Sequence, residues 1–260
     1  MMSNDTQSDN NVIIEFRDVH KSFGRNYVHR GITLKIYRGE TITLIGGSGQ
    51  GKTVLLKELT GLLRPDKGLV IVEGKDVTKM KEKELLDIRK DVGFLFQGAA
   101  LFDSLNVKEN IAYPLREHFK LSEEEIDRIV MEKLKLVGLG DPEVAKLMPS
   151  ELSGGMKKRV GLARAIATNP KIIIYDEPTT GLDPTNVRRI NKLIRDLQQK
   201  LGVTSIAVTH DMQSTFEFTD RIAMLWKGKI IGVGTVDEMR NSENDIIRQF
   251  INGSLPMDDI

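Results

Sequence analysis

The sequence predicts an α/β core that is interrupted by a small helical subdomain. Two short runs, Ile172–Asp176 and Ser205–His210, are almost entirely apolar, which is typical of strands buried on both faces of a parallel sheet. Between them, Asn186–Gly202 has apolar residues at helical spacing and a glycine placed to end the helix. The three segments therefore predict a βαβ unit. In contrast, Gln97–Lys158 has a mostly helical pattern.

Three further strands are expected in the first part of the chain, at Val12–Phe16, Thr41–Ile45 and Leu69–Gly74, because glycines and charged residues bound each run. Near the end, Ala223–Trp226 and Lys229–Val233 flank a Lys-Gly pair, which predicts a β-hairpin. The sequence contains no internal repeat and no low-complexity stretch.

Two amphipathic helices are indicated outside the core. Ser122 and Glu125 form a capping box, and apolar residues continue one face to Gly138. The C-terminal tail, residues 241–260, has isoleucines and a phenylalanine at helical spacing between Ile246 and Ile251. That helix could pack on its own core or contact a second subunit, and the sequence leaves both interpretations open.

Composition excludes some classes of partner. The chain has 260 residues, of which 40% are hydrophobic and 29% charged, as in soluble globular proteins. A net charge of +1 gives no field that would attract nucleic acid. Cysteine is absent, so no disulfide framework or thiolate metal site is expected, and a reducing compartment is compatible. The N-terminus lacks the blocks of a signal peptide, and no apolar run reaches the ~20 residues that span a bilayer. We expect a soluble chain that docks on a membrane protein.

The strongest chemical signal is a P-loop between the strand Thr41–Ile45 and an expected helix with Leu55, Leu59 and Leu62 on one face. Backbone N–H groups of such a loop turn toward phosphate oxygens, and the helix N-terminus adds partial positive charge. The alternative is a glycine-rich turn with a solvated lysine. The loop consists of Gly46, Gly47, Ser48, Gly49, Gln50, Gly51, Lys52 and Thr53. In it, Lys52 would reach the β- and γ-phosphates and Thr53 would ligate Mg²⁺.

Polar residues end the neighbouring buried strands. Asp176 could hold Mg²⁺ through water, and Glu177 is placed to act as general base on an attacking water. The alternative is a pair of acids in an ordinary turn before a proline. His210 would face the ligand crevice at the carboxyl edge of a parallel sheet. A lone histidine there is more often structural, but its position after a strand next to these acids favours a functional role. Gln97 could touch Mg²⁺ or water, which by itself is weak evidence.

A second expected helix has only small residues at its start. Ser153, Gly154 and Gly155 precede a helix with Met156, Val160, Ala163 and Ala167 on one face. The backbone amides and the Ser153 hydroxyl would bind an anion well.

In their order, these motifs resemble the ATP-binding cassette (ABC) ATPase family across about residues 12 to 240. The resemblance implies a P-loop NTPase core with an antiparallel β subdomain and a helical subdomain, ATP and Mg²⁺ as cofactors, and ATP hydrolysis. It also implies a homodimer in which the signature loop of one subunit closes over the ATP held by the other. The implied division is a polar tail at 1–11, the core with its β subdomain at 12–97 and 159–240, the helical subdomain at 98–158, and a C-terminal tail at 241–260.

The resemblance assigns the functions of the family's motif residues to the matching positions of this sequence. Phe23 matches the aromatic that stacks on adenine, with Tyr27 as the alternative. The P-loop is Walker A, Asp176 and Glu177 are Walker B, and Thr53, Gln97 and Asp176 would hold the metal. Ser153, Gly154 and Gly155 match the signature, Asp183 the D-loop, and His210 the switch histidine. Met156 departs from the common glutamine, and a thioether cannot replace its hydrogen bonds. The serine and glycines remain, so we expect hydrolysis to persist.

Local similarity points to a subfamily. Leu152–Met156 and Gly98–His118 resemble the ATPases of Mla/Mce-type lipid transporters, the MlaF type. That resemblance implies phospholipid transport, a permease dimer, an Mce-domain substrate-binding protein, a small regulatory subunit, and a place on the cytoplasmic face of the inner membrane. An apolar step, Ala99–Phe102, would either pack the helical subdomain or form a groove for a permease helix, and both can hold. Alternatives are an ABC ATPase for another solute and, less favoured, one acting on DNA or ribosomes.

Overall fold

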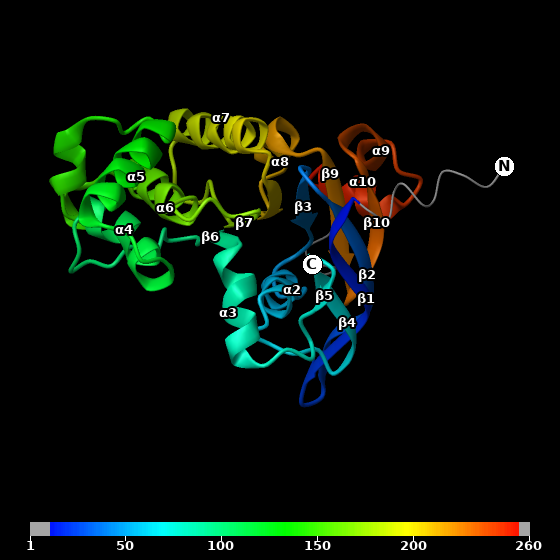
Figure 1. The fold of residues 1–260 in the computed structure, drawn as a ribbon. Coiled ribbons are helices and arrows are strands. Elements are labelled where there is room, and N and C mark those ends of the chain that lie inside the picture. Colours follow the sequence, from blue (N-terminus) through cyan, green and yellow to red (C-terminus); the bar gives the residue numbers. More distant parts are fainter. Residues whose placement is uncertain (1–10, 255–260) are drawn as a thin grey trace. The chain divides into compact units, whose positions relative to one another are not determined.

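The computed structural model describes residues 11–254, which divide into two compact units. The first unit is built from the chain up to Ile88 and from Val208 onward, and the second from Arg89–Ala207. Figure 1 labels most of the helices and strands of both. No helix between residues 11 and 254 is both long and apolar enough to cross a membrane.

An antiparallel sheet of the first unit has the strand order β2-β1-β4-β5. Its strands are β1 (Val12–Phe23), β2 (Asn26–Tyr37), β4 (Lys67–Val72) and β5 (Lys75–Asp76). β1 is longer than the predicted Val12–Phe16 because its polar second half still pairs with β2, across a register shift between Phe16 and Val19. Cross-strand pairing thus extends a strand that periodicity cannot detect.

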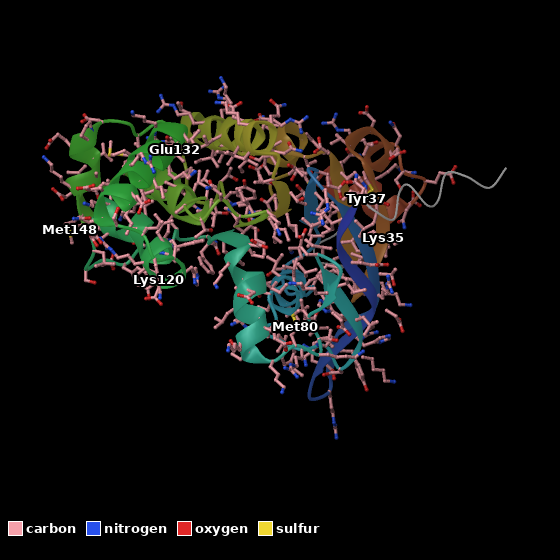
Figure 2. The ribbon with its side chains drawn as sticks, in the orientation of Figure 1. Lys35, Tyr37, Met80, Lys120, Glu132 and Met148 are labelled. Carbon is pink, nitrogen blue, oxygen red and sulfur yellow. The ribbon has the colours of Figure 1, made fainter. Side chains whose placement is uncertain are left out.

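The first unit also contains the parallel pair β3 (Thr41–Ile45) and β9 (Arg221–Trp226), followed by β10 (Lys229–Thr235) antiparallel to β9. The predicted hairpin is confirmed, and both of its turn residues, Lys227 and Gly228, have positive φ values of 44° and 80°. This is the backbone of a type I′ turn. The guanidinium of Arg221 lies 5.0 Å from the ring centroid of Tyr37, which Figure 2 labels on β2.

The P-loop helix α2 (Lys52–Leu59) is shorter than predicted. Its Leu55 and Leu59 are buried, but Leu62 is 65% exposed, so the expectation that all three share a helix face is wrong. The helix ends because Gly61 adopts a left-handed conformation, with φ at 66°, after the C-cap Thr60. Helix α3 (Glu82–Lys90) follows later in the chain.

Three short helices complete the first unit: α8 (Met212–Phe218), α9 (Val236–Arg240) and α10 (Asp245–Ile251). Ile247 and Ile251 of α10 are buried in one cluster with Ile222, Met224 and Trp226 of β9, and Ile246 and Phe250 pack against it. The amphipathic C-terminal helix therefore packs on its own core, which was one of the two interpretations. The last part of the tail, residues 255–260, lies outside the described residues.

The second unit contains the strand order β6-β7-β8, with β6 (Val92–Leu95) parallel to β7 (Ile172–Asp176). β8 (Thr204–Val208) ends before the predicted His210, which follows it in a loop. The predicted helix between β7 and β8 is confirmed as α7 (Pro184–Leu201), and Gly202 ends it with φ at 63°.

Helices dominate the rest of this unit, as predicted: α4 (Val107–His118), α5 (Glu123–Leu136) and α6 (Gly154–Ala165), with short 3₁₀ turns η1 (Pro142–Lys146) and η2 (Pro149–Glu151). The Ser122 capping box is confirmed, because both of its hydrogen bonds form. Helix α4 packs on α5 and α6, and Figure 1 shows these three grouped together. α6 ends at Ala165, so Ala167 lies beyond the helix whose face it was expected to share.

Candidate functional site

The P-loop of the first unit connects β3 to α2 and depends on glycine. Gly46, Gly49 and Gly51 have φ values of 146°, 73° and 99°. A Cβ on Gly46 would lie 2.2 Å from the backbone oxygen of Leu225. The ammonium of Lys52 donates hydrogen bonds to the carbonyls of Gly46 at 2.7 Å and Gly47 at 2.8 Å. The loop therefore wraps around the lysine.

The start of α2 has the properties of an anion site. Its N-cap is Gly51, and no side chain caps the helix. The first N–H groups of a helix have no intrahelical acceptors, and a phosphate is a suitable one. Glycines with positive φ values, an uncapped helix start and an inward lysine together fit a bound nucleotide phosphate.

Two aromatic side chains were candidates for stacking on a base. Phe23 is 50% exposed, and the ammonium of Lys21 lies 5.5 Å from its ring centroid. Tyr27 is 64% exposed and lines a cavity of about 250 Å³ together with Gly49 and Gln50 of the P-loop. Both rings are thus accessible, and Tyr27 shares a hollow with the phosphate loop.

His210 follows β8 and lines a cavity of about 490 Å³. The same cavity is lined by Asp211 and Met212 and by Phe250, Ile251, Asn252 and Gly253 from α10 and the chain after it. Asp211 caps α8 by accepting a hydrogen bond from the Ser214 N–H. The C-terminal helix therefore lies at the wall of the histidine's cavity.

In the second unit, the two acids follow the buried residues of β7. Asp176 ends the strand, and Glu177 adopts a left-handed backbone with φ at 48°. The hydroxyl of Thr180 donates to Oε2 of Glu177 at 3.2 Å. A non-glycine residue in this conformation carries strain, which often marks a functional position.

Asp183 is the N-cap of α7 and accepts hydrogen bonds from the N–H groups of Thr185 and Asn186. The side-chain hydrogen bond from Asn186, followed by its backbone hydrogen bond, lowers the pKa of Asp183. The D-loop candidate is therefore an ionised cap in a defined position.

Ser153 caps α6, and its hydroxyl accepts from the Met156 N–H at 3.3 Å. The two glycines have different surroundings. A Cβ on Gly155 would lie 2.5 Å from Oδ1 of Asn186, whereas one on Gly154 would meet only Leu182, at 3.7 Å. Gly155 therefore leaves room for the side chain of Asn186 at the start of α7, and Gly154 leaves the helix start open.

Lys158 brings Gln97 and Glu177 together. Its side chain is buried, and its ammonium donates to the backbone carbonyls of Gln97 and, at 3.0 Å, of Glu177. Burial lowers the pKa of Lys158, and the negative charges of Glu177 and Asp176 oppose that shift. One cation thus links the two residues that the sequence assigned to water and metal.

Known proteins match most of the chain. Residues 29–180 match the family described as ABC transporter. The "probable ribonucleotide transport ATP-binding protein mkl" of Mycobacterium leprae (strain TN) is 45% identical over 242 residues, which cover 93% of this chain and 69% of the relative. The "intermembrane phospholipid transport system ATP-binding protein MlaF" of Haemophilus influenzae is 39% identical over 244 residues, covering 94% and 92%. The dimeric post-hydrolysis structure of the ATP-binding cassette MJ0796 with ADP and Pi is similar with a TM-score of 0.78 at 33% identity, covering 86% and 98%.

The chain belongs to the ABC transporter family. It is an ATPase subunit of that family and hydrolyses ATP. Both the family resemblance and the fold class that it implied are thereby confirmed.

The apolar segment Ala99–Phe102 of this ABC ATPase contains both packed and cavity-lining residues. Ala99 is 1% exposed and packs inside the second unit, whereas Ala100 and Phe102 line a cavity of about 400 Å³. Aromatic side chains and several cations surround that cavity, namely Phe94, Phe96, Tyr113, Arg89, Lys90 and Arg164. The segment therefore packs the unit and also borders a hollow, and the binding of a permease helix in that hollow stays a prediction.

Three buried polar side chains of the ABC ATPase were not predicted from the sequence, namely the pair His29 and Glu58, and Lys158. Nδ1 of His29 lies 3.0 Å from Oε2 of Glu58 on α2, and both side chains are fully buried. Nε2 of His29 lies 3.1 Å from the carbonyl of Gly51 in the P-loop. An acid between Leu55 and Leu59 on a buried helix face was the signal that could have found this pair. Lys158 had no such signal, because two other basic residues stand beside it.

Proposed function

We propose that this ABC ATPase drives the transport of phospholipids or other lipids between envelope membranes, as in Mla/Mce-type systems. The observation that carries the proposal is the end-to-end similarity to MlaF, which spans 94% of this chain and 92% of the relative. The local motifs at Leu152–Met156 and Gly98–His118 support the same subfamily. The second candidate is transport of another solute, because the M. leprae relative is described as a ribonucleotide transport protein.

At the ATP site, we assign phosphate binding to Gly46–Thr53 and adenine stacking to Phe23, with Tyr27 as the competing aromatic. Oxygen donors suit Mg²⁺, and Thr53, Gln97 and Asp176 supply a hydroxyl, an amide and a carboxylate. Glu177 would take a proton from the attacking water, and His210 would contact the γ-phosphate. The bound Mg²⁺ would supply electrostatic stabilisation of the phosphate oxygens.

We assign residues 12–97 and 159–240 to the ATP-binding core and 98–158 to the helical subdomain. The active species in this proposal is a homodimer, in which Ser153, Gly154 and Gly155 of one subunit complete the site of the other beside Asp183. The dimeric MJ0796 structure with ADP and Pi supports the homodimer in this proposal. The cavity bordered by Ala100 and Phe102 would receive a permease helix at the cytoplasmic face of the inner membrane. An Mce-domain protein and a small regulatory subunit complete the proposed assembly.

The test is a tagged purification from detergent-solubilised native membranes, with mass spectrometry of the co-purifying proteins and lipids. We expect a permease, an Mce-domain protein and bound phospholipid. A different permease without lipid would retain the ATPase and reject the cargo. Co-purification of ribosomes or DNA-bound factors in place of a permease would reject transport altogether.

A further inference from the structure

One side of α6 faces the segment that contains Gln97. Lys158, Gly161 and Arg164 recur at intervals of three residues, so they follow one side of the helix. Each of the three contacts the chain between Leu95 and Ala100. The helix that begins at the signature motif therefore supports the segment that joins Gln97 to the cavity of about 400 Å³.

Lys158 makes an unusual contact for a buried cation. Lys158 is 4% exposed, yet its ammonium donates to two backbone carbonyls, those of Gln97 and Glu177. Buried lysines are rare and are normally paired with a carboxylate. Burial of an ammonium is costly, and the two carbonyls offset part of that cost at the point where two candidate catalytic residues meet.

Gly161 and Arg164 constrain the rest of the segment. A Cβ on Gly161 would lie 3.0 Å from Cδ1 of Leu95 and 3.1 Å from Cβ of Ala99. Arg164 donates from Nη2 to the carbonyl of Ala99 at 2.9 Å and from Nη1 to that of Ala100 at 2.7 Å.

The segment that Arg164 holds is strained. Ala99 and Ala100 have φ values of 61° and 47°, a left-handed conformation that alanine rarely adopts. Two such residues in sequence persist only where the surroundings hold them. Glu177, the other residue that Lys158 touches, is left-handed as well. Lys158 and Arg164 thus bind carbonyls at or next to left-handed residues, and these hydrogen bonds help to hold the strained backbone in place.

We propose that Lys158 and Arg164 are positioning residues for ATP hydrolysis, which hold Gln97, Ala99, Ala100 and Glu177 in the one backbone arrangement that supports turnover. The proposal rests on the assigned roles of Gln97 and Glu177. It requires that loss of either cation reduces kcat, because the backbone of the reacting residues relaxes. ATP affinity changes little, because neither cation belongs to the P-loop.

The experiment uses the full chain purified with its native membrane partners, and measures kcat and KM for MgATP together with the midpoint of thermal unfolding. Lys158→Met keeps the length and removes the donors, and we expect kcat to fall by about tenfold or more with KM changed by less than about twofold. Lys158→Arg restores a cation and should recover part of the loss. The matched control is Lys157→Met, on the same helix and half-buried, which should behave as wild type.

Arg164 provides an independent second test. The order of kcat should be wild type, then Arg164→Lys, then Arg164→Met, because lysine keeps a donor and methionine keeps none. Unchanged kcat in either methionine variant would overturn the proposal. The proposal would also be overturned if Lys158→Met and Lys158→Arg lost kcat equally and in proportion to a lowered midpoint of thermal unfolding. Packing of the side chain would then explain the losses. Full activity in Glu177→Gln would instead reject the assigned base, which separates the two failures.

Discussion

At the scale of single residues, the site depends on polar groups held by backbone atoms. Lys52 binds the carbonyls of its own loop, Lys158 binds those of Gln97 and Glu177, and Asp183 accepts from the start of α7. Backbone oxygens and N–H groups are present whatever the side chain. Sequence patterns therefore identify the charged residue but not the carbonyl or N–H that it contacts.

Replacement of the proposed general base tests its role directly. Glu177→Gln keeps the shape of the side chain, but an amide cannot take the proton of the attacking water. We expect kcat to fall by about 10²- to 10⁴-fold while ATP binding persists. Steady-state hydrolysis and binding of a fluorescent ATP analogue measure the two effects, and hydrolysis at the wild-type rate would reject the assignment.

The buried pair behind the P-loop should couple in stability. Glu58→Leu alone leaves a ring nitrogen of His29 buried without its partner, which costs about 1–3 kcal/mol of unfolding free energy. His29→Leu combined with Glu58→Leu removes both polar groups and should recover most of that loss. Urea unfolding of the single and double variants measures the coupling, and strictly additive losses would show that the pair does not interact.

At the scale of elements, helix ends are set by local chemistry and helix faces by packing. Ser122, Ser153, Asp183 and Thr235 cap their helices as their residue types favour. α10 shows that packing sets the buried face of a helix, since its apolar side could face either the core or another chain. Its burial against β9 decides the question.

Removing a buried side chain of α10 should destabilise the subunit itself. Ile247 is 1% exposed, and Ile247→Ala should lower the free energy of unfolding by about 2–4 kcal/mol. The adjacent Ile246 is only partly buried and serves as the matched control with a smaller loss. Unfolding is followed by circular dichroism on the isolated chain, and equal losses at both positions would contradict the packing.

At the scale of the whole molecule, the proposed ATP site requires two copies of the chain. In a mixture of Lys52→Ala and Ser153→Arg subunits, the heterodimer has one site with an intact P-loop and an intact signature, whereas each homodimer has none. We expect the mixture to recover ATP-dependent dimer formation that both variants lack alone. Light scattering with ATP measures it, and complete loss in the mixture would argue against sites shared between subunits.

Local patterns in the sequence were enough to predict the family, the order of the motifs and most elements of the second half of the chain. Those features depend on contiguous residues: glycine spacing in Gly46–Thr53, apolar runs such as Ile172–Asp176, and the helical period of α7. Such local patterns reflect backbone preferences that act before any tertiary contact forms.

The tertiary structure was needed to find the partners of polar side chains that pair with distant segments. It extended β1 to Phe23, ended α2 at Leu59, buried α10, and placed Lys158 on carbonyls that lie 61 and 19 residues away in the chain. His29 and Glu58 likewise meet across the sheet and the P-loop helix. These outcomes depend on burial and on contacts between distant segments, because a polar group removed from water must be paired wherever the fold places it.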